Sequence, residues 1–520
     1  MKIVLVNCPP QSVRAPPLGL CYLAAYLRKY KHKIFLFDFN IDCYSKAKSY
    51  KEKYLWNRDI NTDWIQAKSF SIKKEIDQWV DKIMKTKSKI IGLSVIDDSK
   101  DISLELAKSI KKKDPSKIII FGGPFCNRTY LKKNEYLNDK DYIDIVVIDE
   151  GEETLREVIE RIETGKKLDN CKGILLRKNG KMIDFGDRQS IHNLDELPFP
   201  DYSDLELSKY AIPEETSILG SRGCISKCVF CQDTIFMGKF RSRTAGNIFR
   251  EMNVRFNQGY REFFFNDLMM NSNPKELEKL CTLILKSRLK GKIRMSGQLR
   301  CRKMKSQLFK KLKHAGCHSL LFGVESGSQR ILDYMNKGYT VKTAEKNIRD
   351  THEAGIETGI CILVGFPGET DKTISDTIKF IKRNHKFIDR LAAIYQLELR
   401  PGCYIDTHYK SFKIIKNRDN YWETKDGKNN FPWRLEQIHK IINTALSLNI
   451  KLEFDEVHFY YYHLLKYYHK YMKDYDKSFD IMKKSLEEFS IRIKSLKEQV
   501  RAKDYKLKEL MNLKDYQKKV

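Results

Sequence analysis

The chain has 520 residues, of which 41% are hydrophobic, and its formal net charge is +29. The length and apolar content exclude wholesale disorder and leave room for two or three domains, each with its own core. The positive charge fits an acidic partner such as nucleic acid, an anionic membrane or a phosphorylated substrate. Because the lysines are dispersed through predicted helices, a generally lysine-rich composition is the simpler explanation.

The thirteen cysteines form an odd number without a framework spacing, which indicates reduced thiols in a cytoplasmic protein. The first residues, 1–6, read as a strand and are too few for a signal-peptide core. No uninterrupted apolar run approaches the roughly 18 residues of a membrane span. We therefore expect a soluble protein of the cytoplasm.

Residues 1–165 alternate short apolar strands with helical segments. The predicted strands are 2–6, 33–39, 90–96, 117–121 and 143–148, and the clearest helices are 18–30 and 152–162. This alternation predicts a doubly wound parallel sheet, in which ligands bind beyond the carboxyl ends of the strands.

The loops after those strands carry Leu18 in Pro-Pro-Leu-Gly-Leu, Ser94, the pair Gly122 and Gly123, and Glu152 in Glu-Gly-Glu. Glycines at strand ends let a ligand approach the backbone, and a serine hydroxyl can hydrogen-bond to it. Most doubly wound folds have such glycines whatever they bind. These loops alone therefore leave a ligand role open.

Residues 166–210 predict a linker with a hairpin that turns at Asn179-Gly180, a pair suited to a type I′ turn. A proline-punctuated stretch, 196–202, then predicts a domain boundary. We expect domains at 1–165 and 211–405 and a helical extension at 406–520.

Three thiols follow the strand-like run 216–219 within eight residues: Cys224, Cys228 and Cys231, spaced C-x3-C-x2-C. Three thiolates on one loop can hold three corners of a [4Fe–4S] cube and leave the fourth iron open. A structural zinc site is one alternative, but it wants four ligands in paired spacings, and no second pair follows nearby. Another alternative is that the three cysteines are buried and unrelated to one another. Arg222-Gly223 and Phe230 argue against it, because they suit a loop that binds a ligand.

Strands and helices alternate again over 216–399, and polar residues end several of the strands. The predicted strands are 216–219, 262–265, 292–296, 319–324, 357–364 and 391–397. The residues at their ends are Asn266-Asp267, Arg300, Gly323-Val324-Glu325-Ser326-Gly327 and Gly365-Phe366-Pro367-Gly368-Glu369-Thr370.

The cysteine spacing, with the aromatic Phe230 before the third cysteine, resembles the radical S-adenosylmethionine (radical SAM) enzymes. The resemblance implies a partial (β/α)6 barrel of TIM type with its chemistry at the carboxyl ends of the strands. It also implies that Phe230, Asp267, Arg300, Glu325 and Ser326 bind the cofactors. The alternative is that the polar residues cap the helices that follow. That alternative is weakest for Glu325, because an acid ending an apolar strand needs a partner when buried.

The loops of residues 1–165, placed ahead of this motif, resemble the cobalamin (B12)-binding domain of B12-dependent radical SAM enzymes. The resemblance implies cobalamin contacts at Leu18, Ser94, Gly122, Gly123 and Glu152. The loop 7–14 lacks the Asp-x-His-x-x-Gly motif found in many B12 proteins. Either cobalt has no protein imidazole below it, or the domain has kept the fold without the cofactor.

The resemblance implies reductive cleavage of SAM to a 5′-deoxyadenosyl radical, used for cobalamin-dependent methylation of an unactivated carbon, with flavodoxin or ferredoxin as the electron donor. An alternative keeps the radical and drops methyl transfer: cyclisation, rearrangement or oxidation of a natural-product, lipid or peptide precursor. An alternative of another class is a zinc-dependent nucleic-acid-binding protein.

Past Pro401-Gly402 the family pattern fades. Residues 410–430 predict a polar loop and 434–449 a helix. Residues 457–471 interleave basic and aromatic side chains, and the last 40 residues have helical spacing. We expect this extension to shape the choice of substrate.

Overall fold

The computed structural model describes residues 1–47, 71–127, 137, 139–233, 237–416 and 421–452. The chain divides into two compact units, each described by itself. The first comprises Met1–Leu320, Glu353–Ile356 and Arg400–Thr407, and the second comprises Leu321–His352, Glu357–Leu399 and His408–Val520. Within the described residues, no helix has both the length and the apolar character to cross a bilayer.

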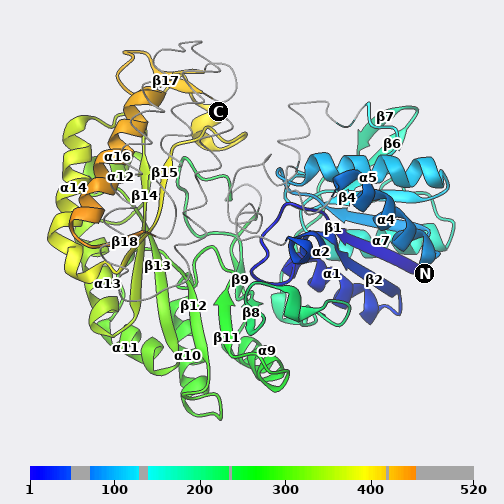
Figure 1. The fold of residues 1–520 in the computed structure, drawn as a ribbon, viewed down its shortest axis with the longest axis horizontal. Helices are drawn as coiled ribbons and strands as arrows, with labels where there is room; N and C mark the ends of the chain where they lie inside the picture. The colour runs from blue at the N-terminus through cyan, green and yellow to red at the C-terminus, as the bar shows by residue number, and fades with distance from the viewer. Residues whose placement is uncertain (48–70, 128–136, 138, 234–236, 417–420, 453–520) are drawn as a thin grey trace. The chain divides into compact units, whose positions relative to one another are not determined.

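The first unit begins with a seven-stranded sheet in the order β2-β1-β3-β4-β5-β6-β7 (Figure 1). Its strands are β1 (Lys2–Asn7), β2 (Lys33–Asp38), β3 (Ile90–Ser94), β4 (Ile118–Gly122), β5 (Ile145–Val147), β6 (Ile174–Lys178) and β7 (Lys181–Asp184). The helices are α1 (Leu18–Lys29), α2 (Phe39–Lys46), α4 (Ile72–Lys85), α5 (Lys100–Lys113) and α7 (Gly151–Glu163). The first five strands pair in parallel, which confirms the predicted alternation.

The order of these strands fixes where a ligand would bind. The chain leaves β1 for β2 on one side and reaches β3 on the other, so the order reverses between β1 and β3. In open sheets of this kind, the crevice beyond the carboxyl ends of the two strands at the reversal is the usual ligand site.

The predicted hairpin forms, but it is not a free-standing linker. β6 pairs antiparallel with β5, and β7 with β6, so the hairpin extends the sheet. Asn179 and Gly180 have φ angles of 48° and 79°, as a type I′ turn requires. The N-terminal sheet is therefore mixed rather than wholly parallel.

A second sheet has the order β18-β15-β14-β13-β12-β11-β8. Its strands are β8 (Glu215–Ile218), β11 (Glu262–Phe265), β12 (Arg294–Leu299), β13 (Cys317–Glu325), β14 (Glu357–Val364), β15 (Arg390–Gln396) and β18 (Lys451–Leu452). The helices that follow are α9 (Ala245–Asn257), α10 (Pro274–Leu285), α11 (Ser306–His314), α12 (Gln329–Tyr334), α13 (Val341–Glu353), α14 (Asp371–Asn384), α15 (Tyr404–Thr407) and α16 (Phe431–Ser447). β8, β11 and β12 belong to the first unit, β14, β15 and β18 to the second, and β13 continues from one into the other.

The prediction that residues 410–430 are only a polar loop is wrong. They contain β16 (Ile414–Lys416) and β17 (Trp422–Thr424), which pair antiparallel. Trp422 is buried and its indole N–H donates to the carbonyl of Leu397 at 2.9 Å, which anchors the hairpin to the chain after β15. Residues 457–471 and the last 40 residues lie outside the described ranges.

Candidate active site

The cysteine loop starts from a turn that only glycine fits. β8 leads into the short strand β9 (Ser221–Arg222), which pairs with β10 (Arg241–Ser242). Gly223 follows with φ +78°, and a Cβ there would lie 2.5 Å from the carbonyl oxygen of Lys239. The chain therefore turns sharply just before Cys224 and enters the loop.

Hydrogen bonds within the loop orient its sulfur atoms. The backbone N–H of Ser226 donates to Cys224 Sγ at 3.3 Å, and the N–H of Cys231 donates to the carbonyl of Cys228 at 3.1 Å. An N–H that points at sulfur stabilises a thiolate, the form that binds iron.

Exposure separates these three cysteines from the rest. Cys224, Cys228 and Cys231 are half-buried, whereas the other ten of the thirteen are buried. Burial raises the pKa of Cys8 and Cys281 to about 12, so these thiols stay protonated and unreactive. No three His, Cys, Asp or Glu side chains of the described ranges converge on a single ion. Each thiolate of a cube binds a different iron, so the loop fits a [4Fe–4S] cluster without such convergence.

Asp267, at the end of β11, holds the chain that enters the loop. Its Oδ2 accepts the N–H of Gly220 at 2.9 Å, and the hydroxyl of Ser221 donates to Oδ1. Burial raises the pKa of Asp267 to about 6, while these two donors act to lower it. Both carboxylate oxygens thus accept hydrogen bonds from the segment that leads into the cluster loop.

The segment Arg400–Thr407, which the sequence analysis did not single out, also forms hydrogen bonds with the cluster loop. The N–H of Ile405 donates to the carbonyl of Val229 at 2.9 Å, and Gln232 Nε2 donates to the carbonyl of Pro401 at 3.0 Å. The only local signal was the Pro401-Gly402 turn. This segment holds the cluster loop from a place about 170 residues further along the chain.

Arg300 follows β12, and the side chain of Asn271 fixes its backbone. Asn271 Oδ1 accepts the N–H of Arg300 at 3.0 Å, and Nδ2 donates to the Arg300 carbonyl at 2.8 Å. Asn271 is fully buried, and sequence reasoning missed it. A polar residue six positions after the predicted strand end gave no distinguishing signal.

In the second unit, Glu325 ends β13 in a strained conformation with φ +66°. Lys337 Nζ lies 3.1 Å from Glu325 Oε1, and both side chains are largely buried. A Cβ on Gly323 would lie 2.6 Å from the same carboxylate oxygen, so a larger residue there would displace the Glu325 side chain. The partner that a buried acid needs is therefore Lys337.

Thr370 caps its helix as the capping alternative expects, whereas the N-cap of α12 is Ser328 rather than Ser326. Ser326 is buried, accepts the N–H of Ser328 at 3.1 Å and lies 3.3 Å from the hydroxyl of Thr377. Thr370 is the N-cap of α14, where it forms a reciprocal capping box with Thr373.

Strand register brings the predicted residues of the N-terminal sheet to one edge. Asn7, Ser94 and Gly122 are neighbours across β1, β3 and β4, at the reversal of strand order. Gly123 follows with φ +96°, and a Cβ there would lie 2.9 Å from the backbone of Val95. Asn7 Oδ1 is buried and has no hydrogen-bond partner among the described residues. A half-buried serine, two glycines and an unpartnered amide oxygen fit the polar tail of a cobalamin.

Leu18 and Glu152 lie differently. Leu18 begins α1, half-buried, and packs against the apolar cluster that includes Tyr22. The Glu152 carboxylate forms an ion pair with Arg222 of β9, Oε1 to Nη2 at 2.5 Å. The Glu152 carboxylate is therefore engaged in an ion pair within the chain.

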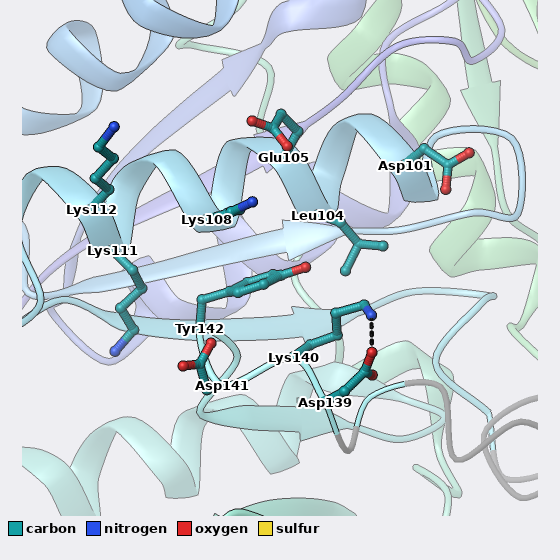
Figure 2. A pocket seen from close by; sticks show the side chains of 10 residues that line it. All are labelled: Asp101, Leu104, Glu105, Lys108, Lys111, Lys112, Asp139, Lys140, Asp141 and Tyr142. Atoms are coloured by element: carbon teal, nitrogen blue, oxygen red, sulfur yellow. Dashed lines mark hydrogen bonds and ion pairs between the residues drawn. The ribbon is translucent and has the colours of Figure 1, made fainter.

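A groove of about 620 Å³ along α5 holds none of the predicted site residues (Figure 2). Its lining balances four basic against four acidic side chains: Lys108, Lys111, Lys112 and Lys140 with Asp101, Glu105, Asp139 and Asp141. Lys140 pairs with Asp139 at 2.6 Å. This balance favours neither an anion nor a cation, so the groove is not the candidate site.

Two family models match the chain. The Radical SAM superfamily matches residues 218–381, and the B12 binding domain matches residues 12–159. An uncharacterized methyltransferase of Pyrococcus horikoshii is 27% identical over 74% of this chain and 78% of its own length. An anaerobic magnesium-protoporphyrin IX monomethyl ester cyclase of Cereibacter sphaeroides is 24% identical over 58% of this chain and 50% of its own.

Among solved structures, the radical SAM methyltransferase TsrM from Kitasatospora setae, with cobalamin and a [4Fe–4S] cluster bound, aligns with a TM-score of 0.64. The alignment covers 94% of this chain and 99% of TsrM at 15% identity, so it shows a shared fold. The sheet, the cysteine loop and the matched models define a radical SAM enzyme. More particularly, the chain belongs to the radical SAM enzymes that carry an N-terminal B12-binding domain.

Proposed function

We propose that this enzyme methylates an unactivated carbon in a cobalamin-dependent reaction. The observation that carries the proposal is the loop with three half-exposed thiols in a chain that also has a B12-binding domain. The relative from Pyrococcus horikoshii is named a methyltransferase, as is TsrM, which supports methyl transfer over cyclisation or oxidation. The domain match disfavours the zinc-dependent nucleic-acid binder.

We assign the cluster to Cys224, Cys228 and Cys231. When bound, the cluster and cobalamin supply one-electron reduction of SAM and carriage of its methyl group. Gly223, Asp267 and the segment Arg400–Thr407 fix the backbone of the loop that carries the three cysteines. The loop would supply three thiolates and no fourth ligand, so one iron of a bound cluster would be left for SAM.

The remaining assignments extend this proposal to the other predicted residues. For Phe230, Arg300 and Glu325, the proposal keeps the role in binding SAM that the family resemblance implies. Ser94, Gly122 and Gly123 would line the tail of cobalamin, with Leu18 beside them at the start of α1. For Ser326 and Glu152 we assign internal roles, because their polar atoms are engaged within the chain.

The substrate class and the setting follow from the same chemistry. We infer a small-molecule, lipid or peptide substrate and a flavodoxin or ferredoxin as electron donor. Because none of the thirteen cysteines forms a disulfide in the described residues, a reducing compartment such as the cytoplasm suits the protein.

The test needs no known substrate. Anaerobically reconstituted protein is given reductant, cobalamin and SAM labelled on the methyl group, and S-adenosylhomocysteine and 5′-deoxyadenosine are measured. Methyl transfer predicts release of S-adenosylhomocysteine that requires cobalamin. Formation of 5′-deoxyadenosine alone, with no effect of cobalamin, would reject methylation and favour cyclisation, rearrangement or oxidation.

A further inference from the structure

Two domains of the first unit are joined by a buried ion-pair network next to the cluster loop. On the N-terminal domain it comprises Glu150, just before α7, and Glu152, in its first turn. On the cysteine side it comprises Arg222 of β9 and Arg241 of β10, which face each other in strand register. Two cations thus meet two carboxylates.

The contacts are close and shielded from water. Arg222 Nη2 lies 2.5 Å from Glu152 Oε1, and Arg222 Nη1 lies 3.3 Å from Glu150 Oε1. Arg241 Nη2 lies 2.8 Å from the same Glu150 oxygen, and Arg241 Nη1 donates to Glu150 Oε2 at 3.0 Å. The Arg222 and Glu152 side chains are 13% and 5% exposed. Charges in such a setting are weakly screened and act on their neighbours over several ångströms.

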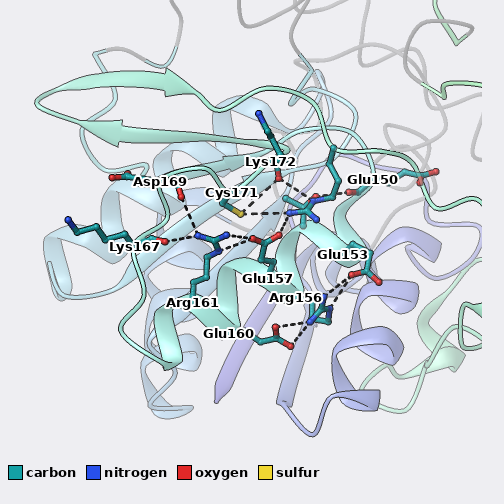
Figure 3. Close-up of polar contacts among 12 residues, drawn as sticks. Glu150, Glu153, Arg156, Glu157, Glu160, Arg161, Lys167, Asp169, Cys171 and Lys172 are labelled. Carbon is teal, nitrogen blue, oxygen red and sulfur yellow. Dashed lines mark hydrogen bonds and ion pairs between the residues drawn. The ribbon is translucent and has the colours of Figure 1, made fainter.

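The rest of α7 behaves differently, as Figure 3 shows. Arg156 pairs with Glu153 and Glu160 three and four residues away, and Arg161 pairs with Glu157, all within the helix. These pairs follow the spacing of an ordinary helix surface. Only the carboxylates at the start of α7 pair with arginines of β9 and β10. Glu152 and its partner Arg222 are 70 residues apart in the sequence.

The network is adjacent to the iron ligands. Arg222 is two residues before Cys224, with only Gly223 between them, and the turn at Gly223 is fixed by its approach to Lys239. Reduction of a [4Fe–4S] cluster adds one negative charge to it. A net positive charge nearby favours that electron and a net negative charge opposes it.

We propose that Arg222 is a positioning residue that ties the cluster loop to the B12-binding domain through Glu150 and Glu152, and that the charge balance of this network tunes the potential at which the cluster accepts its electron. The proposal rests on the cluster assigned above. It gives Glu152 a role between the two domains in place of a cobalamin contact.

The experiment is a redox titration of the reconstituted full-length protein, followed by electron paramagnetic resonance of the reduced cluster. Arg222→Gln removes a cation and leaves the carboxylates in excess, so the ratio of reduced to oxidised cluster at a fixed potential falls by about tenfold, or about 59 mV for one electron. Glu152→Gln leaves Arg222 in excess, so the same ratio rises. The double variant has no change of net charge and returns close to the wild-type ratio.

A control and a rescue separate this effect from structural damage. Glu160→Gln removes the same charge from the same helix, about 12 Å further along it and 42% exposed, and leaves the potential unchanged. Arg222→Lys keeps the cation and restores most of the wild-type ratio. Iron content is measured in every sample.

Opposite shifts in the two single variants support the proposal. Shifts in the same direction, or no shift in Glu152→Gln with full iron content, overturn it. If Arg222→Gln cannot hold its cluster, the Glu152→Gln shift alone decides. Wild-type protein that binds no iron would instead overturn the proposed function, and this inference with it.

Discussion

At the scale of single residues, the cysteines differ in how far solvent or a ligand can reach their sulfur atoms. Cys224, Cys228 and Cys231 lie half-exposed on a loop, whereas a thiol such as Cys281 is fully buried inside α10. The sequence spacing alone predicted these three as the cluster ligands. It could not show that the ten other cysteines are withdrawn into the core, because burial depends on how distant segments pack.

The first prediction compares two cysteine variants. Cys228→Ala leaves one iron of the cluster without a protein ligand, so reductive cleavage of SAM falls below detection. Cys281→Ala removes a buried sulfur at a cost of about 1 kcal/mol and keeps both the iron and the cleavage. The measurement is 5′-deoxyadenosine formed per protein under anaerobic reduction. Wild-type cleavage in Cys228→Ala would contradict the ligand assignment.

A second prediction concerns Glu369, in the turn before α14. Burial raises its pKa to about 8 from 4.5, although the N–H of Gly365 donates to it at 2.5 Å and acts to lower it. The folded state therefore binds this proton more tightly than the unfolded state. Its contribution to stability is complete below pH 4.5 and is lost as the pH rises toward 8, at up to about 1.4 kcal/mol per pH unit.

The variant Glu369→Gln cannot titrate, so the melting temperature of the wild type should fall relative to it between pH 5 and 8. Glu436→Gln on α16, whose side chain is 58% exposed, should show a constant difference over the same range. If the melting temperatures of the wild type and Glu369→Gln change in parallel with pH, Glu369 does not carry this proton.

At the scale of elements, short turns place the site. The cluster loop depends on Gly223, whose left-handed backbone puts the chain against the carbonyl oxygens of Lys239 and Gly238. The alternation of strands and helices was predictable from local hydrophobic spacing. Local spacing did not predict that the β6–β7 hairpin pairs with β5, and it did not predict the β16–β17 hairpin. Edge pairing depends on contacts that local spacing does not encode.

The third prediction tests that turn with a matched pair of glycines. Gly223→Ala places a Cβ 2.5 Å from a backbone oxygen at φ +78°, so the loop shifts and the reconstituted iron content falls by half or more. Gly259→Ala meets the same kind of backbone strain at φ +101° with nothing within 4 Å. It should lose about 1 kcal/mol of stability and keep its iron. Equal iron contents in the two variants would remove the steric argument.

At the scale of the whole molecule, the chain combines two α/β domains whose strand ends carry most of the predicted site residues. Parallel strands end at a common edge, which is why Ser94, Gly122 and Gly123 could be predicted together from sequence. The Arg222–Glu152 pair, the Asn271 side chain and the segment Arg400–Thr407 could not. Each joins positions that are far apart in sequence or outside any motif, and only the folded chain brings them together.

The central claim is a cluster with one iron open to SAM. The most direct measurement is the electron paramagnetic resonance spectrum of anaerobically purified, reduced protein, recorded with and without SAM alongside iron and sulfide analysis. We predict about four irons per chain and a signal that changes when SAM is added. Colourless protein without iron, or a cluster signal indifferent to SAM, would contradict the claim.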